Sequence, residues 1–249
     1  MLAATGSEDI EDVLNDSPYT FTPLEEKLAA FNAKANKSLG RQPSSYYHNA
    51  LNYFIGDKEL NSWQSLAIQG VADVAERLNE GGDTQRLIEA LPKIPERPFM
   101  VLCSFLEHVE PTIGIVETLA QQIDYELQQK EPNIEKICAC LRGASNSPVR
   151  ALLEQMVIKT LKDDCSKKIE ILAVISGRLW QLLENSQICT LFVERLAEND
   201  ADYSGFSQVL ADAMFMPGLR EHIMKALRCP ERSDTLSKRV GEMFGQART

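Results

Sequence analysis

The stretch from Trp63 to Leu78 reads WQSLAIQGVADVAERL. Its apolar residues recur every three or four positions, which is the spacing of one face of an α-helix. They are Trp63, Leu66, Ala67, Gly70, Val71, Val74 and Leu78. No part of the sequence combines sustained alternation of apolar and polar residues with the β-branched enrichment of a strand. The sequence therefore predicts an all-α protein, with one helix over residues 63–78.

Helix-breaking residues divide the whole chain into short amphipathic segments. Pairs of these segments begin near Thr22, Lys58, Arg97, Asn133, Lys167 and Tyr203, so that successive starts lie 34 to 39 residues apart. Such a period is typical of helical hairpins that bury their apolar faces on their neighbours. We therefore expect stacked antiparallel hairpins in an α-α superhelix, as in HEAT and TPR proteins. A compact helical bundle is the alternative, because the units share little sequence identity.

The sequence predicts where the helical domain begins. Residues 1–21 are expected to be a weakly ordered acidic segment, with at most a short turn over residues 7–14. The first firm helix start is at Thr22, which can cap the helix, while Pro23 suits its first position and Glu25 can complete a capping box. One helical domain is expected from residue 22 to residue 249.

Three prolines crowd one connection within this domain. Pro92, Pro95 and Pro98 exclude regular helix over residues 92–98, because proline lacks a backbone N–H and restricts the residue before it. The sequence therefore predicts a bend between two halves that still share one core.

The charge of the chain is acidic and uneven. The 249 residues carry a net charge of -10, which disfavours nonspecific binding to nucleic acid and to anionic membranes. Residues 1–20 hold five acids and no base, whereas residues 217–249 hold seven bases and four acids. The basic C-terminal part could favour an acidic partner. A solvated helix face, or an intramolecular complement to the acidic start, is the alternative.

The cysteines and the hydropathy pattern indicate a cytoplasmic protein. The sequence lacks a secretory signal and a run of 18 apolar residues, so we expect no membrane segment. The six cysteines are therefore expected to be reduced, with four of them as small buried hydrophobes. Cys138 and Cys140 would point about 200° apart on a helix and could not chelate one ion. One buried and one partly exposed thiol are expected there.

No recognisable catalytic or cofactor motif is present. The three histidines, His48, His108 and His222, lie far apart in the sequence and form no metal-ligand spacing. We therefore expect no catalytic, cofactor or metal site, and a protein that is not an enzyme. The alternative is an enzyme with an unrecognised site that includes His108, Arg150 and Arg178.

Two regions are candidates for binding a partner. Aromatic rings are densest from Tyr46 to Phe54, where Tyr46, Tyr53 and Phe54 are expected in the core. Tyr47 and His48 are expected to be exposed and are candidate contact residues, because aromatic side chains often anchor interfaces. The apolar cluster of residues 214–216 is expected to pack at the end of the core, with a contact patch as the alternative.

The basic C-terminal helices form the second region. Arg220, Arg228 and Arg232 are candidate partner-binding residues there. Nucleic-acid contact is the alternative for this region, through Arg220, Lys225, Arg228, Arg232, Lys238 and Arg239. The hypothesis for the whole chain is a noncatalytic helical-repeat protein that binds a protein or peptide partner on one face.

Four stretches resemble a known family. They are NDSPYTFTP at residues 15–23, AIQGVADVAERL at 67–78, LCSFLEH at 102–108 and FMPGLR at 215–220. Together they resemble an uncharacterised gammaproteobacterial family known only as a domain of unknown function. The resemblance covers most of residues 15–245 and implies a bacterial cytoplasmic protein whose relatives carry further sequence ahead of this region. It implies no activity, so no functional residue carries over.

Overall fold

The computed structural model describes residues 25–80 and 82–246, and these residues form helices and turns without a strand. The prediction of an all-α protein is confirmed. The elements, where η marks a 3-10 helix, are α2 (Glu25–Ser38), α3 (Tyr47–Phe54), η1 (Leu60–Ser65), α4 (Ile68–Glu76), α5 (Thr84–Ala90), η2 (Leu91–Lys93), α6 (Glu96–Leu106), α7 (Ile113–Leu127), α8 (Ile134–Ala144), α9 (Arg150–Lys162), η3 (Asp164–Lys167), α10 (Ile169–Arg178), η4 (Trp180–Glu184), α11 (Ser186–Ala197), α12 (Asp202–Met214), α13 (Leu219–Leu227) and α14 (Asp234–Gln246).

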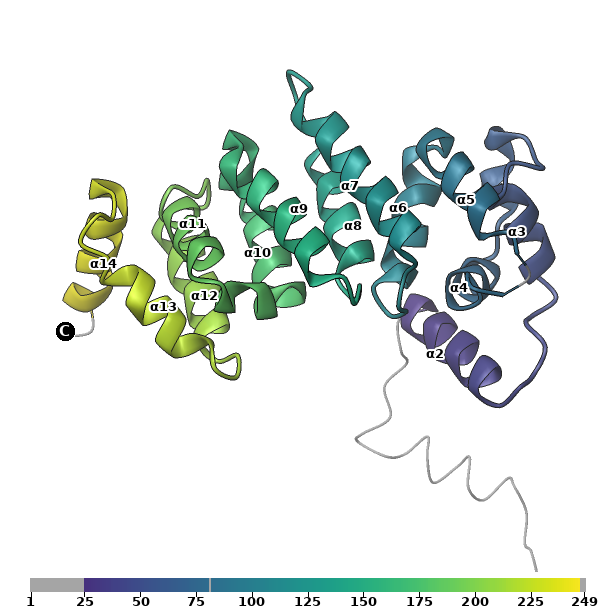
Figure 1. The fold of residues 1–249 in the computed structure, drawn as a ribbon, viewed down its shortest axis with the longest axis horizontal. Coiled ribbons are helices and arrows are strands. Elements are labelled where there is room, and N and C mark those ends of the chain that lie inside the picture. Colours follow the sequence, from purple (N-terminus) through teal and green to yellow (C-terminus); the bar gives the residue numbers. More distant parts are fainter. Residues whose placement is uncertain (1–24, 81, 247–249) are drawn as a thin grey trace, which may run out of the picture.

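The helices lie side by side in a long row, with α2–α5 at one end and α13–α14 at the other (Figure 1). From α4 onward, each α-helix up to α12 contacts the α-helix two places further along the chain. The series α4, α6, α8, α10 and α12 runs through the row, and so does the series α5, α7, α9, α11 and α13. One apolar core, from Ala29 to Val240, follows these contacts. Much of the apolar core is therefore buried between helices that lie two places apart in the chain.

The predicted helix over residues 63–78 is wrong at its first turn. Leu66 and Ala67 are extended, with ψ angles of 122° and 137°, and they separate η1 from α4. Within η1, the Ser65 hydroxyl donates to the carbonyl of Ser62 at 2.8 Å. Serine hydroxyls that bond nearby carbonyls compete with regular helix. Trp63 still packs on the core, so the apolar spacing alone did not reveal the break.

The expectation that residues 92–98 exclude helix is also partly wrong. Helix α6 begins at Glu96, and Pro98 is buried in its first turn. The first N–H groups of a helix have no partner within the helix, so proline is tolerated there. Across this connection α4 packs on α6 and α5 packs on α7.

Tyr46 corrects the prediction for the aromatic cluster. Tyr53 and Phe54 are fully buried as predicted, but Tyr46 is 54% exposed. Its backbone, not its ring, faces the neighbouring helix. A Cβ on Gly70 of α4 would lie 2.7 Å from the carbonyl oxygen of Tyr46, so the glycine lets the two backbones approach. The close backbone contact turns the Tyr46 ring outward.

The start of the chain falls outside the described residues. The expected acidic segment over residues 1–21 and the capping residue Thr22 are among them. The predicted stop at Gly40 is confirmed, since α2 ends at Ser38 and Gly40 has a φ of 65°. None of the helices in the described ranges combines the length and the apolar character that a bilayer crossing requires.

Candidate functional site

A groove runs along α13, opposite the last turn of η4 and the first turns of α11. Its volume is about 1020 Å³, roughly twice that of a second groove across α6, α8 and α10, at about 500 Å³. It is lined by Glu184, Ser186, Thr190, Arg220, Glu221, His222, Met224, Lys225, Ala226, Arg228, Cys229 and Pro230. Met224, Cys229 and Thr190 are half-buried, whereas the cations are exposed. The groove therefore has a partly apolar floor and a charged rim.

The rim of the groove is positive in an acidic protein. Arg220, Lys225 and Arg228 form no ion pair with any residue that the structure describes. Two acids share the lining, and one of them, Glu184, lies 3.6 Å from Arg150. Cations without a local partner are available to an anionic ligand. Each of them can donate a charge-assisted hydrogen bond, which is stronger than one between neutral groups.

The sequence of α13 explains why these cations face outward. Leu219, Ile223 and Leu227 are buried at a spacing of four residues. Helical geometry then places Arg220, Lys225 and Arg228 within an arc of about 140° on the other side.

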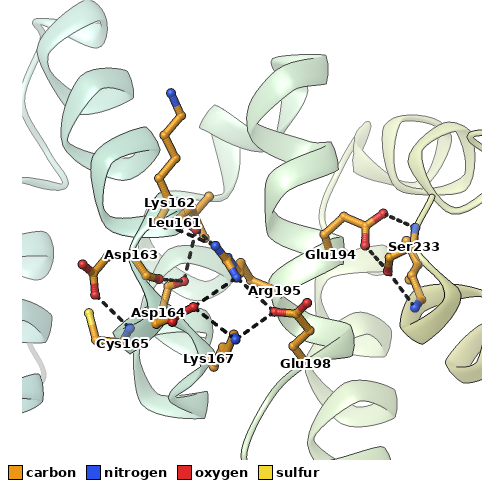
Figure 2. Close-up of polar contacts among 12 residues, drawn as sticks. Leu161, Lys162, Asp163, Asp164, Cys165, Lys167, Glu194, Arg195, Glu198 and Ser233 are labelled. Atoms are coloured by element: carbon orange, nitrogen blue, oxygen red, sulfur yellow. Dashed lines mark hydrogen bonds and ion pairs between the residues drawn. The ribbon is translucent and has the colours of Figure 1, made fainter. Parts of the chain in front are cut away.

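A second set of contacts ties the segment after α13 to α11 (Figure 2). One oxygen of Glu194, on α11, accepts from the backbone N–H of Ser233 at 3.0 Å, and the other accepts from the Ser233 hydroxyl at 2.5 Å. Arg232 donates to the carbonyl of Leu227 at 2.5 Å and to the hydroxyl of Ser237 at 2.9 Å. The candidate residue Arg232 therefore braces the end of α13 and does not line the groove, unlike Arg220 and Arg228.

Arg195 docks α11 on the preceding hairpin, as Figure 2 shows. Its Nε donates to the carbonyl of Leu161 at 2.8 Å and its Nη2 to the carbonyl of Lys162 at 3.1 Å. Its Nη1 lies 3.0 Å from Glu198. These carbonyls end α9 and have no partner within that helix, so the guanidinium supplies one.

Other arginines also donate to backbone carbonyls of distant segments, and no pattern noted in the sequence predicted these contacts. Arg77 donates to the carbonyl of Arg41 at 2.6 Å, and Arg239 donates to the carbonyl of Ala197 at 3.2 Å. In all three cases a glutamate three residues later pairs with the arginine, in Arg77–Glu80, Arg195–Glu198 and Arg239–Glu242. The R-x-x-E spacing alone does not identify these residues, because Arg86–Glu89 and Arg228–Glu231 share it and neither arginine contacts a carbonyl among the described residues.

The remaining candidate contact residues lie far from the groove. Tyr47 and His48 belong to α3, at the opposite end of the row from α13 (Figure 1). His48 is exposed, but Tyr47 is half-buried and packs on the core, which corrects the expectation that it is exposed. Burial, followed by the nearby Glu80, raises the pKa of Tyr47. The five candidate residues therefore do not form one surface.

The residues of the enzyme alternative are only partly brought together. His108 and Arg178 both approach Glu107, with Nε2 of the histidine at 3.5 Å and Nη2 of the arginine at 3.3 Å from the same oxygen. Arg150 instead pairs with Glu154 at 3.1 Å. His108 and Arg178 therefore share the Glu107 carboxylate, whereas Arg150 belongs to a different ion pair.

The thiols behave as hydrophobic side chains. Cys138 and Cys140 are both buried, which corrects the expectation that one is partly exposed. Helix α8 is covered on several sides, by α6, α7 and α10, so even side chains about 200° apart are enclosed. Burial raises the pKa of Cys138 to about 11 and that of Cys140 to about 12. Within residues 25–80 and 82–246, no three potential ligands gather to hold a metal ion.

The turn after α12 exposes an aromatic side chain. Phe215 is 88% exposed, so the expectation that residues 214–216 pack at the end of the core is wrong for it. Helix α12 ends at Met214 and Gly218 turns the chain with a φ of 79°, after which Leu219 takes the core position. The turn thus leaves Phe215 on the outside.

The comparisons with known proteins give a family without a described activity. No curated protein and no solved structure matches the chain. A family model described as "Protein of unknown function (DUF3549)" matches residues 1–244. The resemblance to an uncharacterised family is therefore confirmed over almost the whole chain. The chain belongs to this family of proteins of unknown function, DUF3549.

Proposed function

We propose that this protein is a noncatalytic helical-repeat protein that binds an acidic segment of a partner protein in the groove along α13. The observation that carries the proposal is the rim of Arg220, Lys225 and Arg228 beside a half-buried floor, in a chain of net charge -10. As part of the proposal, it acts in the bacterial cytoplasm, where its six free cysteines would stay reduced.

The chemistry of the groove favours a protein segment that carries both acidic and apolar side chains. Arginine binds carboxylates through two parallel hydrogen bonds, and Met224 on the floor can pack against varied apolar side chains. Nucleic acid is a poorer fit. It would be repelled by the acidic body, and Arg232 and Arg239 of the basic region already donate to backbone carbonyls.

The direct test measures binding of a short labelled amphipathic peptide with glutamates along one face. Fluorescence anisotropy would compare it with the same peptide carrying glutamines. We expect the acidic peptide to bind the full chain more tightly, and the binding to weaken between about 50 and about 300 mM salt. The variant Arg220→Gln/Lys225→Gln/Arg228→Gln should bind at least about tenfold more weakly, because it loses three attractive charges.

A matched control separates the groove from net charge. Lys93, Lys130 and Lys162 are exposed and line other parts of the row. Lys93→Gln/Lys130→Gln/Lys162→Gln changes the net charge equally and should bind within about twofold of the parent. Equal weakening in both triple variants, or equal binding of the acidic and glutamine peptides, would contradict the proposal.

A pull-down from bacterial lysate extends the test to the natural partner. A protein captured by the parent chain and by the control variant, but not by the groove variant, would support the proposal. Capture of nucleic acid that is lost at moderate salt would instead support the nucleic-acid alternative.

A further inference from the structure

The chain carries a segment whose pattern matches the groove. Residues 7–16 read SEDIEDVLND, with five acids: Glu8, Asp9, Glu11, Asp12 and Asp16. Ile10, Val13 and Leu14 are spaced i, i+3 and i+4, which would put them on one face of a helical turn. The segment precedes the described residues, so its sequence pattern alone enters the inference.

The groove offers the complementary pattern. Arg220, Lys225 and Arg228 line its rim, and Met224 and Cys229 lie half-buried on its floor. We propose that residues 7–16 of one copy bind in this groove of a second copy. The inference rests on the proposed function, because it uses the same groove, and it names an acidic occupant for it.

The arrangement of the helices favours a second copy over the same chain. Helix α2 begins below α6, and the row from α6 through α8, α10 and α12 to α13 has four helix-to-helix steps (Figure 1). Helix axes that pack together are about 8–10 Å apart, so these steps span about 32–40 Å. From Asp16 to Glu25 the chain has nine Cα–Cα steps, which reach at most about 32 Å when fully extended. The segment of one chain would therefore have to be fully extended to touch its own groove, which favours the groove of a second copy.

Such binding joins different surfaces of the two copies. Residues 7–16 of one chain occupy the groove along α13 of the next chain. This is a head-to-tail contact, and it can continue from copy to copy. Assembly would then rise with protein concentration and fall with salt, because opposite charges drive it. An acidic segment of a partner protein would compete with residues 7–16 for the groove.

The test uses two full-length variants and sedimentation velocity. The segment variant is Glu8→Gln/Asp9→Asn/Glu11→Gln/Asp12→Asn, and the groove variant is Arg220→Gln/Lys225→Gln/Arg228→Gln. We expect the parent chain to associate at low salt and each variant alone to stay monomeric. An equimolar mixture of the two should form a dimer and stop there, because it holds one intact segment and one intact groove per pair.

A control variant checks that the effect is not one of net charge. Glu59, Glu96, Glu117 and Asp212 are exposed acids elsewhere in the row. Glu59→Gln/Glu96→Gln/Glu117→Gln/Asp212→Asn should associate like the parent chain. A mixture of segment and groove variants that stays monomeric would overturn the inference, as would a parent chain that is monomeric at every concentration.

A synthetic peptide of residues 1–20 separates this inference from the proposed function. We expect it to bind the segment variant, whose groove is intact, and not the groove variant. If a generic acidic peptide binds the groove and the 1–20 peptide does not, self-recognition is wrong and the proposed function stands. If neither peptide binds, both fail. The parent chain could be monomeric and bind the 1–20 peptide less tightly than the segment variant does. That result would mean that the parent's own segment competes for its groove, and it would overturn binding to a second copy.

Discussion

Nε of Arg195 on α11 lies 2.8 Å from the carbonyl oxygen of Leu161 on α9. This hydrogen bond joins two helices through residues that are 34 positions apart in the sequence. The same helix α11 forms one side of the groove and, through Glu194, holds the segment that follows α13. The docking of α11 therefore supports the side of the proposed binding site that Ser186 and Thr190 line.

Replacing Arg195 should destabilise the protein. Arg195→Ala removes two charge-assisted hydrogen bonds to carbonyls at the end of α9 and should lower the free energy of unfolding by about 2 kcal/mol. Urea denaturation followed by circular dichroism measures it. Arg86→Ala is the control, because the Arg86 side chain is 48% exposed and pairs with Asp57 on the surface. It should cost less than about 1 kcal/mol, and equal losses would contradict the capping role.

A charge in the core should unfold the chain. Leu172 on α10 is fully buried and Leu153 on α9 is 5% exposed. Leu172→Asp places an unpaired carboxylate in this core and should cost about 4 kcal/mol or more. Phe215→Asp is the matched control, because that side chain is 88% exposed, and its stability should stay within about 0.5 kcal/mol of the parent. A Leu172→Asp protein with parental stability in urea would refute the packing described for α10.

Two glycines should respond in opposite directions to alanine. A Cβ at Gly70 would lie 2.7 Å from the Tyr46 carbonyl, and the backbone there cannot move without shifting α3. Gly70→Ala should therefore destabilise the protein by about 1–3 kcal/mol. A Cβ at Gly177, in α10, meets nothing within 4 Å, so Gly177→Ala should stabilise it by about 0.5 kcal/mol. Thermal unfolding of both variants checks the contrast, and a shift of the same sign would contradict it.

The thiols should differ in reactivity, with Cys229 reacting first. Cys229 is half-buried and lines the groove, whereas Cys103, Cys138, Cys140 and Cys189 are buried. Burial, followed by a hydrogen bond with Asp163, raises the pKa of Cys165 to about 12, so about one such thiol in ten thousand is ionised at pH 8. Iodoacetamide labelling read by peptide mass spectrometry should modify Cys229 before any other thiol.

The acidic peptide probe provides a functional control for this labelling. If the peptide occupies the groove, it should slow the labelling of Cys229, while its glutamine version should not. Labelling of Cys165 or Cys138 as fast as that of Cys229 would contradict the burial described for these thiols.

The Asp164–Lys167 contact should show in a pH titration. A hydrogen bond from Lys167, whose Nζ lies 3.1 Å from the carboxylate, lowers the pKa of Asp164 below its usual range. A carboxyl with a lowered folded-state pKa stabilises the fold above its unfolded pKa, and that contribution is lost as the pH falls through the folded-state value. NMR titration should find a higher Asp164 pKa in Lys167→Gln than in the parent. An unchanged pKa would show that the contact does not persist in solution.

The candidate site could be predicted only in part. The gathering of bases in the C-terminal helices predicts Arg220 and Arg228 as binding residues, and both line the groove. Arg232 looks the same in sequence, but its guanidinium donates to the Leu227 carbonyl. Lining residues such as Glu184 and Thr190 come from segments some 30 residues or more before α13, and no local pattern connects them with it.

The sequence by itself determined that the chain is helical and where most helices begin and end. Apolar spacing, prolines and glycines are local signals, and the i to i+4 hydrogen bonds of a helix are local too. Only the tertiary structure decided which cationic side chains bond to groups of the chain itself and which are available to a ligand. The outcome depends on the carbonyls and carboxylates that packing brings near each cation. The tertiary structure also turned Tyr46 and Phe215 outward, since a backbone contact with Gly70 and a tight turn at Gly218 outweigh the apolar character of these side chains.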